Sequence, residues 1–357
     1  MKILKLYILK EFFPLLFLSF IIFTSILLLG NMLELLEMVG KGGIAAGKLI
    51  FYISLFSISY SLPMSTLAAT MMSFGRLAQD NEITAAKASG IKVRSLLTPV
   101  LIMGFLLSLF SLYLNNSVVP KAQYRFEVLS QNLGTKNPEL IFRARTFIKN
   151  FEGYRLFVEK VKGNLLYGVH IWQLRKENPP LTIFAKRGKI TSDPAKRMIT
   201  LKLMNGTREE VDPGVRGEYS RSEFSVYYFN IALPAERVRT NKRRKEMTIR
   251  ELREAIKELK GKRVYPLLVE IHRKLSLSFA CLTFVLIGAP LGVMFKKGGK
   301  SIGFGLSFLL ILIYYIMTML GESLGERGVL PPVLTMWAPT ILLSSIGLFL
   351  IFRRIER

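Results

Sequence analysis

The sequence predicts a polytopic α-helical membrane protein with six transmembrane helices and a β-rich domain inserted between helices 3 and 4. Three observations lead to this fold class. Half of the 357 residues, 50%, are hydrophobic. They gather in six runs of about 20 residues or more, the length that an α-helix needs to cross a bilayer. A long polar stretch between the third and fourth runs holds short alternating segments, which are typical of β-strands.

The apolar runs fix where the spans are expected. The first run lacks a small-residue cleavage site, so we expect it to remain as a span and not to be removed as a signal peptide. The predicted spans are 12–36, 49–75, 96–119, 275–295, 302–321 and 332–352.

Positive charges in the short connecting segments predict the orientation. Lys and Arg lie in the N-terminal segment, after the second and fourth runs, and at the C-terminus. Cytoplasmic segments of membrane proteins are enriched in these residues. With six spans, these four segments fall on one side, so both termini are expected in the cytoplasm. The stretch 120–266 is then expected on the opposite side.

The six segments TFIKNF, YRLFVEK, GVHIWQL, LTIFAKR, RMITLKL and SEFSVYYFNI are predicted to be strands. Turn signals separate them, at Glu152-Gly153, Asp193-Pro194, Asn205-Gly206 and Asp212-Pro213-Gly214. Short strands at this spacing favour a sandwich or a jelly roll.

A helix follows the strands. Thr248 and Glu251 have the spacing of a capping box, and an apolar stripe follows at Leu252, Ile256 and Leu259. We expect this helix to lie on the membrane surface or against the β domain.

Charge and cysteine content narrow the partners. The net charge is +25, with no basic motif of the nucleic-acid-binding kind, so anionic lipid or an anionic substrate is the expected partner. The single cysteine, Cys281, lies in an apolar run and cannot form a disulfide within the chain.

Candidate catalytic residues are few. His272 lies beside Glu270 and Arg273, but neither histidine has partners at metal-ligand spacing, so no catalytic residue, metal or cofactor is predicted. The segment 294–301 ends like a nucleotide-binding loop but has Met294 where the motif requires glycine. If nucleotide energy is used, a separate subunit must bind the nucleotide.

The loop after the second span, residues 75–91, is predicted to contain a short helix. Asp80 or Asn81 can cap it, small side chains permit close approach by a partner, and Gly90 ends it. An ordinary loop helix and a helix that docks into a cytoplasmic partner both fit these residues.

Several sequence motifs resemble those of a known protein family. The loop GRLAQDNEITAAKASGI resembles LptF/LptG, the permease subunits of the lipopolysaccharide exporter. Other segments resemble it too: Leu62-Pro63-Met64, Tyr265-Pro266, Gly288-Ala289-Pro290-Leu291-Gly292, Pro331-Pro332 and Trp337-Ala338-Pro339. The turn 38–44 is more similar to LptF than to LptG.

The resemblance implies a function, a location and partners. It implies a permease subunit of an ABC transporter in the bacterial inner membrane. Such a transporter extracts lipopolysaccharide and passes it to the periplasmic bridge toward the outer membrane. The implied partners are an LptB-type ATPase dimer, which hydrolyses ATP, a sibling LptG- or LptF-type permease, and an LptC-type protein. The inserted domain would be a periplasmic β-jelly roll.

The resemblance also implies site residues. The loop would be a coupling helix docked into the ATPase, with Glu82 forming a salt bridge. Its expected docking residues are Arg76, Leu77, Asp80, Asn81, Glu82, Thr84, Ala85, Ala86, Ser89 and Gly90. Basic residues at the periplasmic ends of the spans would meet lipid phosphates, although for any single residue snorkelling at the interface is the more common explanation. They are Lys41, Lys48, Arg263, Arg273 and Arg327.

These expectations divide the chain into three regions. Residues 1–120 hold transmembrane helices 1–3 with the coupling helix at about 79–90, residues 121–247 the jelly roll, and residues 248–357 the connecting helix and helices 4–6. Two alternatives stay open. One is a membrane-bound lipid-modifying enzyme with Glu270, His272 and Arg273 at its centre. The other is a scaffold that transports nothing.

Overall fold

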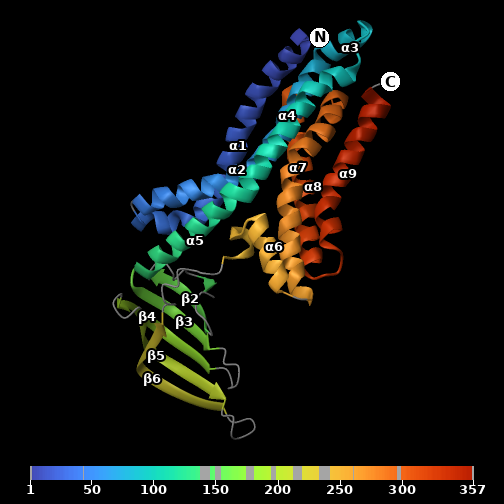
Figure 1. The fold of residues 1–357 in the computed structure, drawn as a ribbon. Helices are drawn as coiled ribbons and strands as arrows, with labels where there is room; N and C mark the ends of the chain where they lie inside the picture. Colours follow the sequence, from blue (N-terminus) through green and yellow to red (C-terminus); the bar gives the residue numbers. More distant parts are fainter. Residues whose placement is uncertain are drawn as a thin grey trace. The chain divides into compact units, whose positions relative to one another are not determined.

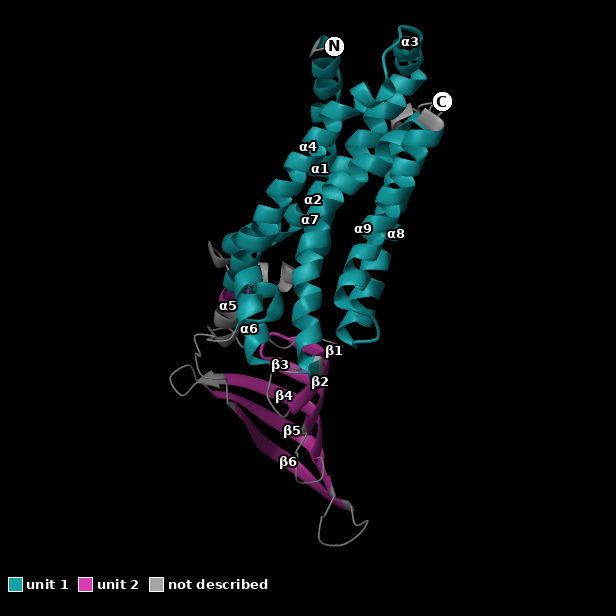
Figure 2. Ribbon diagram, turned by 45° about the vertical axis from the view of Figure 1, so that its right-hand side comes forward, with its two compact units in different colours: residues 1–35, 47–126, 242–357 teal, residues 36–46, 127–241 magenta. Residues whose placement is uncertain are grey.

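A computed structural model describes residues 2–42, 44–136, 145–148, 154–173, 181–193, 198–211, 219–232, 242–259, 261–295 and 299–355 of the chain. The chain divides into two compact units (Figure 2). The helical unit contains residues 1–35, 47–126 and 242–357, and the sheet unit contains residues 36–46 and 127–241.

The helices of the chain confirm the predicted six spans (Figure 1). Six are long and apolar enough to cross a membrane, and they extend beyond the predicted limits at one or both ends. The helices are α1 (Lys2–Gly42), α2 (Ile44–Gln79), α3 (Glu82–Ala88), α4 (Val93–Tyr113), α5 (Val119–Lys136), α6 (Ile249–Glu258), α7 (Tyr265–Met294), α8 (Gly299–Glu326) and α9 (Pro332–Leu350). A π-helical turn, η1 (Leu114–Val118), joins α4 to α5.

Helix α7 lies at the centre of the helical unit, where it packs against α4, α8 and α9. Glycines permit its close contacts. A Cβ atom on Gly292 would lie 2.7 Å from the Met71 carbonyl oxygen on α2, and one on Gly347 of α9 would lie 2.6 Å from that of Leu286. Packing of this kind replaces the hydrophobic effect as the force that joins helices within lipid.

Polar side chains add a second link between the helices. Asn115 of η1 accepts a hydrogen bond from the Ser59 hydroxyl at 2.6 Å and donates one to the Ser278 hydroxyl at 3.3 Å. Because all three side chains are buried, these bonds connect α2, η1 and α7 where water does not compete.

The sheet unit contains one antiparallel sheet of six strands in sequence order. This sheet confirms the predicted inserted β domain and is compatible with a jelly roll. The strands are β1 (Thr146–Ile148), β2 (Tyr154–Lys162), β3 (Leu165–Gln173), β4 (Leu181–Asp193), β5 (Met198–Val211) and β6 (Tyr219–Ala232).

A crease crosses this sheet at one row of residues. Pairing is interrupted at Glu159, Gly168, Lys186, Asn205 and Ser225, while the register stays the same on both sides. Gly168 and Asn205 have left-handed backbones, with φ of 61° and 54°. The predicted turn at Asn205-Gly206 is therefore wrong: these residues lie inside β5. Their left-handed preference produces the crease instead of a chain reversal.

The crease also changes which residues face the core. On β3, Leu166 is buried on one side of the row, and Val169 and Ile171 on the other. On β4, Ala185 is buried before the row and Ile190 after it. The buried positions thus pass from even to odd numbers on β3 and from odd to even on β4. This switch explains why the sequence alternates only in part.

Helix α6 begins with the predicted capping box. The Thr248 hydroxyl accepts from the Glu251 backbone N–H at 3.2 Å, and the Glu251 carboxylate accepts from the Thr248 N–H at 2.7 Å. The apolar stripe of α6 packs against Leu267 and Ile271 of α7. The stripe therefore faces another helix, where the sequence led us to expect the membrane surface or the β domain.

Candidate functional site

The first candidate site is the short helix α3 and its attachment. Ile83, 5% exposed, fixes α3 to the core that contains Leu77 and Val93. Gly90, with φ of 76°, ends the helix as predicted. Its N–H donates to the Lys87 carbonyl at 2.9 Å, and the Ile91 N–H donates to that of Ala86 at 3.0 Å. This Schellman motif holds the last turn of α3 in one geometry.

The start of α3 differs from the predicted cap. Asn81 occupies the N-cap position with a left-handed backbone, φ 56°, and its side chain makes no capping hydrogen bond. Asp80 instead pairs with Arg76, so neither predicted side chain caps the helix. The turn depends on the left-handed conformation that Asn tolerates well.

The small side chains of α3 divide into two faces. Thr84, Ala85, Ala88 and Ser89 are exposed, whereas Ala86 packs against the buried core. A shallow exposed face of this kind allows the backbone of a partner to approach closely.

An ion-pair cluster lies at the base of α3, around Arg76 at the end of α2. Its Nε is 2.7 Å from Glu11 Oε1, and its Nη1 is 3.1 Å from Asp80 Oδ2 and 3.4 Å from Glu82 Oε1. The Tyr7 hydroxyl accepts from Arg76 at 2.9 Å and donates to Glu82 at 2.9 Å. The cluster thus connects α1, α2 and α3.

The predicted lipid-binding residues other than Arg273 are either exposed or have side chains outside the described residues. Lys48, Arg263 and Arg327 are exposed. The side chain of Lys41 lies outside the described residues. The segments that carry Arg263 and Arg327 lie close together. A Cβ atom on Gly328, next to Arg327, would lie 2.9 Å from the ring of Tyr265.

Arg273 has a different setting. Its guanidinium donates to both oxygens of Glu270, at 3.0 and 2.6 Å, and to the Tyr60 hydroxyl at 2.8 Å. The Tyr315 hydroxyl in turn donates to the Tyr60 carbonyl at 3.3 Å. Arg273, with a side chain only 12% exposed, therefore joins α7 to α2, and the Tyr315 bond joins α2 to α8.

The alternative catalytic centre is not assembled in this structure. Glu270 is engaged by Arg273, and His272 accepts a long hydrogen bond, 3.4 Å, from the Trp337 indole of α9. Among the described residues, no group of three or more His, Cys, Asp or Glu could hold a metal ion.

Sequence reasoning missed Tyr7, Glu11 and Tyr60, which complete these clusters. Tyr60 lies in the second predicted run, whereas Tyr7 and Glu11 precede the first predicted run and fall inside the span Ile3–Asn31 of the structure. Each contacts a residue more than 60 positions away. Their only signal is a polar or ionisable side chain in a span, which marks functional positions in membrane proteins.

Known proteins resemble this chain over most of its length. Residues 6–353 match the family described as lipopolysaccharide export system permease LptF/LptG. Uncharacterized protein RP871 of Rickettsia prowazekii is 23% identical over 279 residues, 75% of this chain and 76% of that protein. The lipopolysaccharide export system permease protein LptF of Escherichia coli (strain K12) is 23% identical over 295 residues, 81% of this chain and 77% of that protein.

Proposed function

The chain belongs to the LptF/LptG family of lipopolysaccharide export permeases, and on that premise we propose its place in a transporter. It is one permease subunit of an ABC transporter that extracts lipopolysaccharide from the inner membrane and passes it to the periplasmic bridge. A sibling LptG- or LptF-type permease, an LptB-type ATPase dimer and an LptC-type protein complete the assembly. ATP hydrolysis takes place in the ATPase and not in this chain.

The exposed face of α3 carries the docking part of this proposal. This face enters a groove of the ATPase on the cytoplasmic side, and its residues are Thr84, Ala85, Ala88 and Ser89. Ile83 and the Arg76 cluster keep α3 fixed to α1 and α2, so motion of the ATPase reaches both spans. Glu82 forms a salt bridge with the ATPase while it remains in reach of Arg76, 3.4 Å away.

Co-purification tests the docking face. Ala85→Trp and Ala88→Trp place a large ring on the exposed side of α3, and we expect each to reduce ATPase recovery with the permease about fivefold or more, since loss of close packing at a docking surface costs roughly 1–3 kcal/mol. Val329→Trp, 64% exposed in the α8–α9 connection, is the matched control and should leave recovery unchanged. Full recovery with both α3 variants would contradict docking through this face.

The lipid path forms the second part of the proposal. Lys41, Lys48, Arg263 and Arg327 contact phosphates of lipopolysaccharide at the periplasmic ends of the spans. Arg273, whose guanidinium is oriented by Glu270 of the same helix, contributes by holding Tyr60 of α2 against α7. The β-jelly roll then receives the lipid.

Photocrosslinking tests these contacts. Lys41→Glu and Lys48→Glu should each reduce crosslinking to lipopolysaccharide about fivefold or more, because a charge near a lipid phosphate contributes about 1 kcal/mol and its reversal doubles the effect. Lys92→Glu, an exposed residue at the start of α4, makes the same charge change on the predicted cytoplasmic side and should have little effect. Equal crosslinking in all three variants would remove these lysines from the path.

A further inference from the structure

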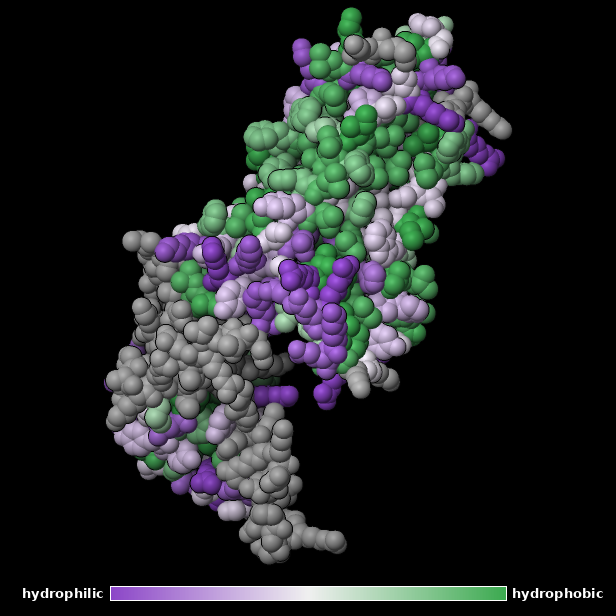
Figure 3. Space-filling view, in the orientation of Figure 1, coloured by the Kyte–Doolittle hydropathy of each residue, from purple (hydrophilic) through white to green (hydrophobic). Residues whose placement is uncertain are grey.

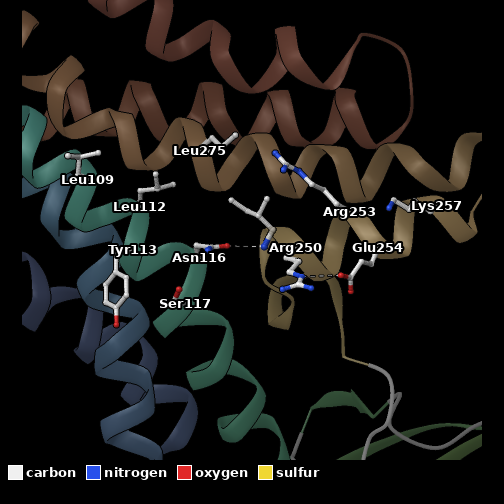
Figure 4. A pocket seen from close by; sticks show the side chains of 11 residues that line it. Leu109, Leu112, Tyr113, Asn116, Ser117, Arg250, Arg253, Glu254, Lys257 and Leu275 are labelled. Atoms are coloured by element: carbon white, nitrogen blue, oxygen red, sulfur yellow. Dashed lines mark hydrogen bonds and ion pairs between the residues drawn. The ribbon is translucent and has the colours of Figure 1, made fainter.

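A pocket of about 760 Å³ lies beside α6 in the helical unit (Figure 4). Spans supply one side of it and α6 supplies the other. Its lining residues are Leu109, Leu112, Tyr113, Asn116, Ser117, Ile249, Arg250, Arg253, Glu254, Lys257 and Leu275. None of them belongs to the Arg76 cluster or to the basic residues that we assign to the lipid path.

Helix α6 is fixed beside the spans by several independent contacts. The Ile249 N–H donates to the Asn116 side-chain oxygen at 2.9 Å. Lys274 of α7 donates to the Met247 carbonyl, and Leu252 is fully buried against α7. Burial raises the pKa of Glu251, but its hydrogen bonds with Lys242 and Thr248 outweigh burial and hold the pKa below its ordinary value. The capping carboxylate thus stays ionised at neutral pH, and α6 presents its side chains from a fixed position.

The α6 side of the pocket is cationic. Arg250, Arg253 and Lys257 recur at spacings of three and four, which places them on one face of the helix. Arg250 is 3.2 Å from Glu254, the carboxylate of this face. This face therefore carries three cations and one carboxylate, and Arg250 pairs with that carboxylate. Figure 3 shows hydrophilic residues gathered where α6 meets the hydrophobic surface of the spans.

The opposite side of the pocket is mostly apolar, with Asn116 and Ser117 as its polar residues. Leu109 and Tyr113 are 45% and 61% exposed on a candidate membrane span, and Leu112 and Leu275 complete the wall. Large apolar side chains exposed on a span are suited to hydrocarbon. The pocket thus joins a surface for acyl chains to a group of cations at the end of a span. An occupant must be apolar at one end and anionic at the other.

We propose that this pocket binds an anionic glycerophospholipid of the surrounding bilayer. Its phosphate lies between Arg253 and Lys257, and its acyl chains lie against Leu109, Leu112 and Tyr113. Basic residues at a membrane surface attract anionic headgroups in this way. The site is separate from the transported lipid and does not depend on the proposed transport function. The bound lipid fastens α6 to spans 3 and 4.

Native mass spectrometry of the full-length protein tests the proposal. The protein is purified from nanodiscs of phosphatidylglycerol and phosphatidylcholine in equal amounts, and retained lipid is measured. We expect phosphatidylglycerol to be retained in preference. Arg253→Gln together with Lys257→Gln should weaken its binding about thirtyfold, from about 1 kcal/mol for each basic residue near a membrane surface. Lys121→Gln together with Lys245→Gln, both exposed outside the pocket, should leave binding unchanged.

A second pair of variants tests the apolar wall without changing charge. Leu109→Trp fills the pocket and should reduce retention of phosphatidylglycerol, whereas Leu106→Trp, 51% exposed on the same span, should not. Undiminished retention in both pocket variants, or equal retention of the two lipids by the unaltered protein, would overturn the site. Displacement of phosphatidylglycerol by an equimolar amount of lipid A would show that the pocket does not prefer a glycerophospholipid.

Discussion

Glu270 and Arg273 of α7 form an ion pair that is largely shielded from solvent, with side chains 4% and 12% exposed. Removing such charges from water is costly, and the pair persists because both carboxylate oxygens and the Tyr60 hydroxyl satisfy the guanidinium. A partner left alone would be a buried, unpaired charge. The stability of the fold should therefore fall most when a substitution removes only one member of the pair.

Glu270→Ala should lower the free energy of unfolding by about 3–5 kcal/mol, because it leaves Arg273 unpaired in the interior. The double variant Glu270→Leu with Arg273→Met should recover only part of that loss, because it still leaves the buried Lys274, 4.0 Å from Glu270, without its carboxylate. Denaturant unfolding of the purified protein in detergent measures both. Glu254→Ala, which breaks the exposed pair with Arg250, should cost less than about 1 kcal/mol. Equal losses for Glu270→Ala and Glu254→Ala would contradict this account.

At the scale of elements, close contact between spans depends on glycines that meet backbone atoms. The Met71 carbonyl oxygen lies only 2.7 Å from the position of a Cβ atom on Gly292, and a backbone oxygen cannot turn aside as a side chain can. Gly292 belongs to the segment Gly288–Gly292, which the sequence singled out by resemblance. Its physical role is to let α7 approach α2.

Gly292→Leu should prevent α2 and α7 from packing and should reduce the yield of folded protein severely, since overpacking of a tight contact costs at least about 1–3 kcal/mol. Gly305→Leu is the matched control in α8, because a Cβ atom there has open space, and it should be tolerated. The measurement is the fraction of monodisperse protein after extraction in detergent. Monodisperse Gly292→Leu protein at the control level would show that the contact is not needed.

The elements also show what sequence could predict. Six spans, the strands and the α6 capping box follow from length, period and local spacing, and all were recognised. The burial of Ala86 was not recognised, because a helix of seven residues has too few turns to reveal which face it buries. The turn assigned to Asn205-Gly206 was wrong because the left-handed preference of Asn serves a crease as well as a reversal. Long-range partners such as Tyr60 leave no local pattern.

At the scale of the molecule, the positive segments predict a topology in which α3 is cytoplasmic and the sheet is periplasmic. The native chain is convenient for testing this, because its single cysteine, Cys281, is fully buried. Thr84 on α3 and Ser222 on β6 are both exposed positions for a new cysteine.

In spheroplasts, Ser222→Cys should react with a membrane-impermeant maleimide, and Thr84→Cys should react only after permeabilisation. The reason is that long domains cross the membrane regardless of charge, whereas short positive loops stay in the cytoplasm. The unaltered protein serves as the control and should remain unlabelled until it is denatured. The reverse pattern of labelling would invert the topology.

The crease in the sheet has a consequence for mutational scans. Buried and exposed residues alternate along a strand with a period of two, and at the row through Gly168 the buried positions shift by one residue. A scan of charged substitutions along β3 should find the apolar positions Leu166, Val169 and Ile171 sensitive, the first two being three residues apart. Gly168 should be sensitive as well, because of its left-handed backbone. If hydrophobicity is analysed over a sequence window that includes this row, the patterns on its two sides are out of register and the alternation is no longer detected. An alignment with a distant relative that relies on this pattern will therefore slip by one residue unless Gly168 anchors it.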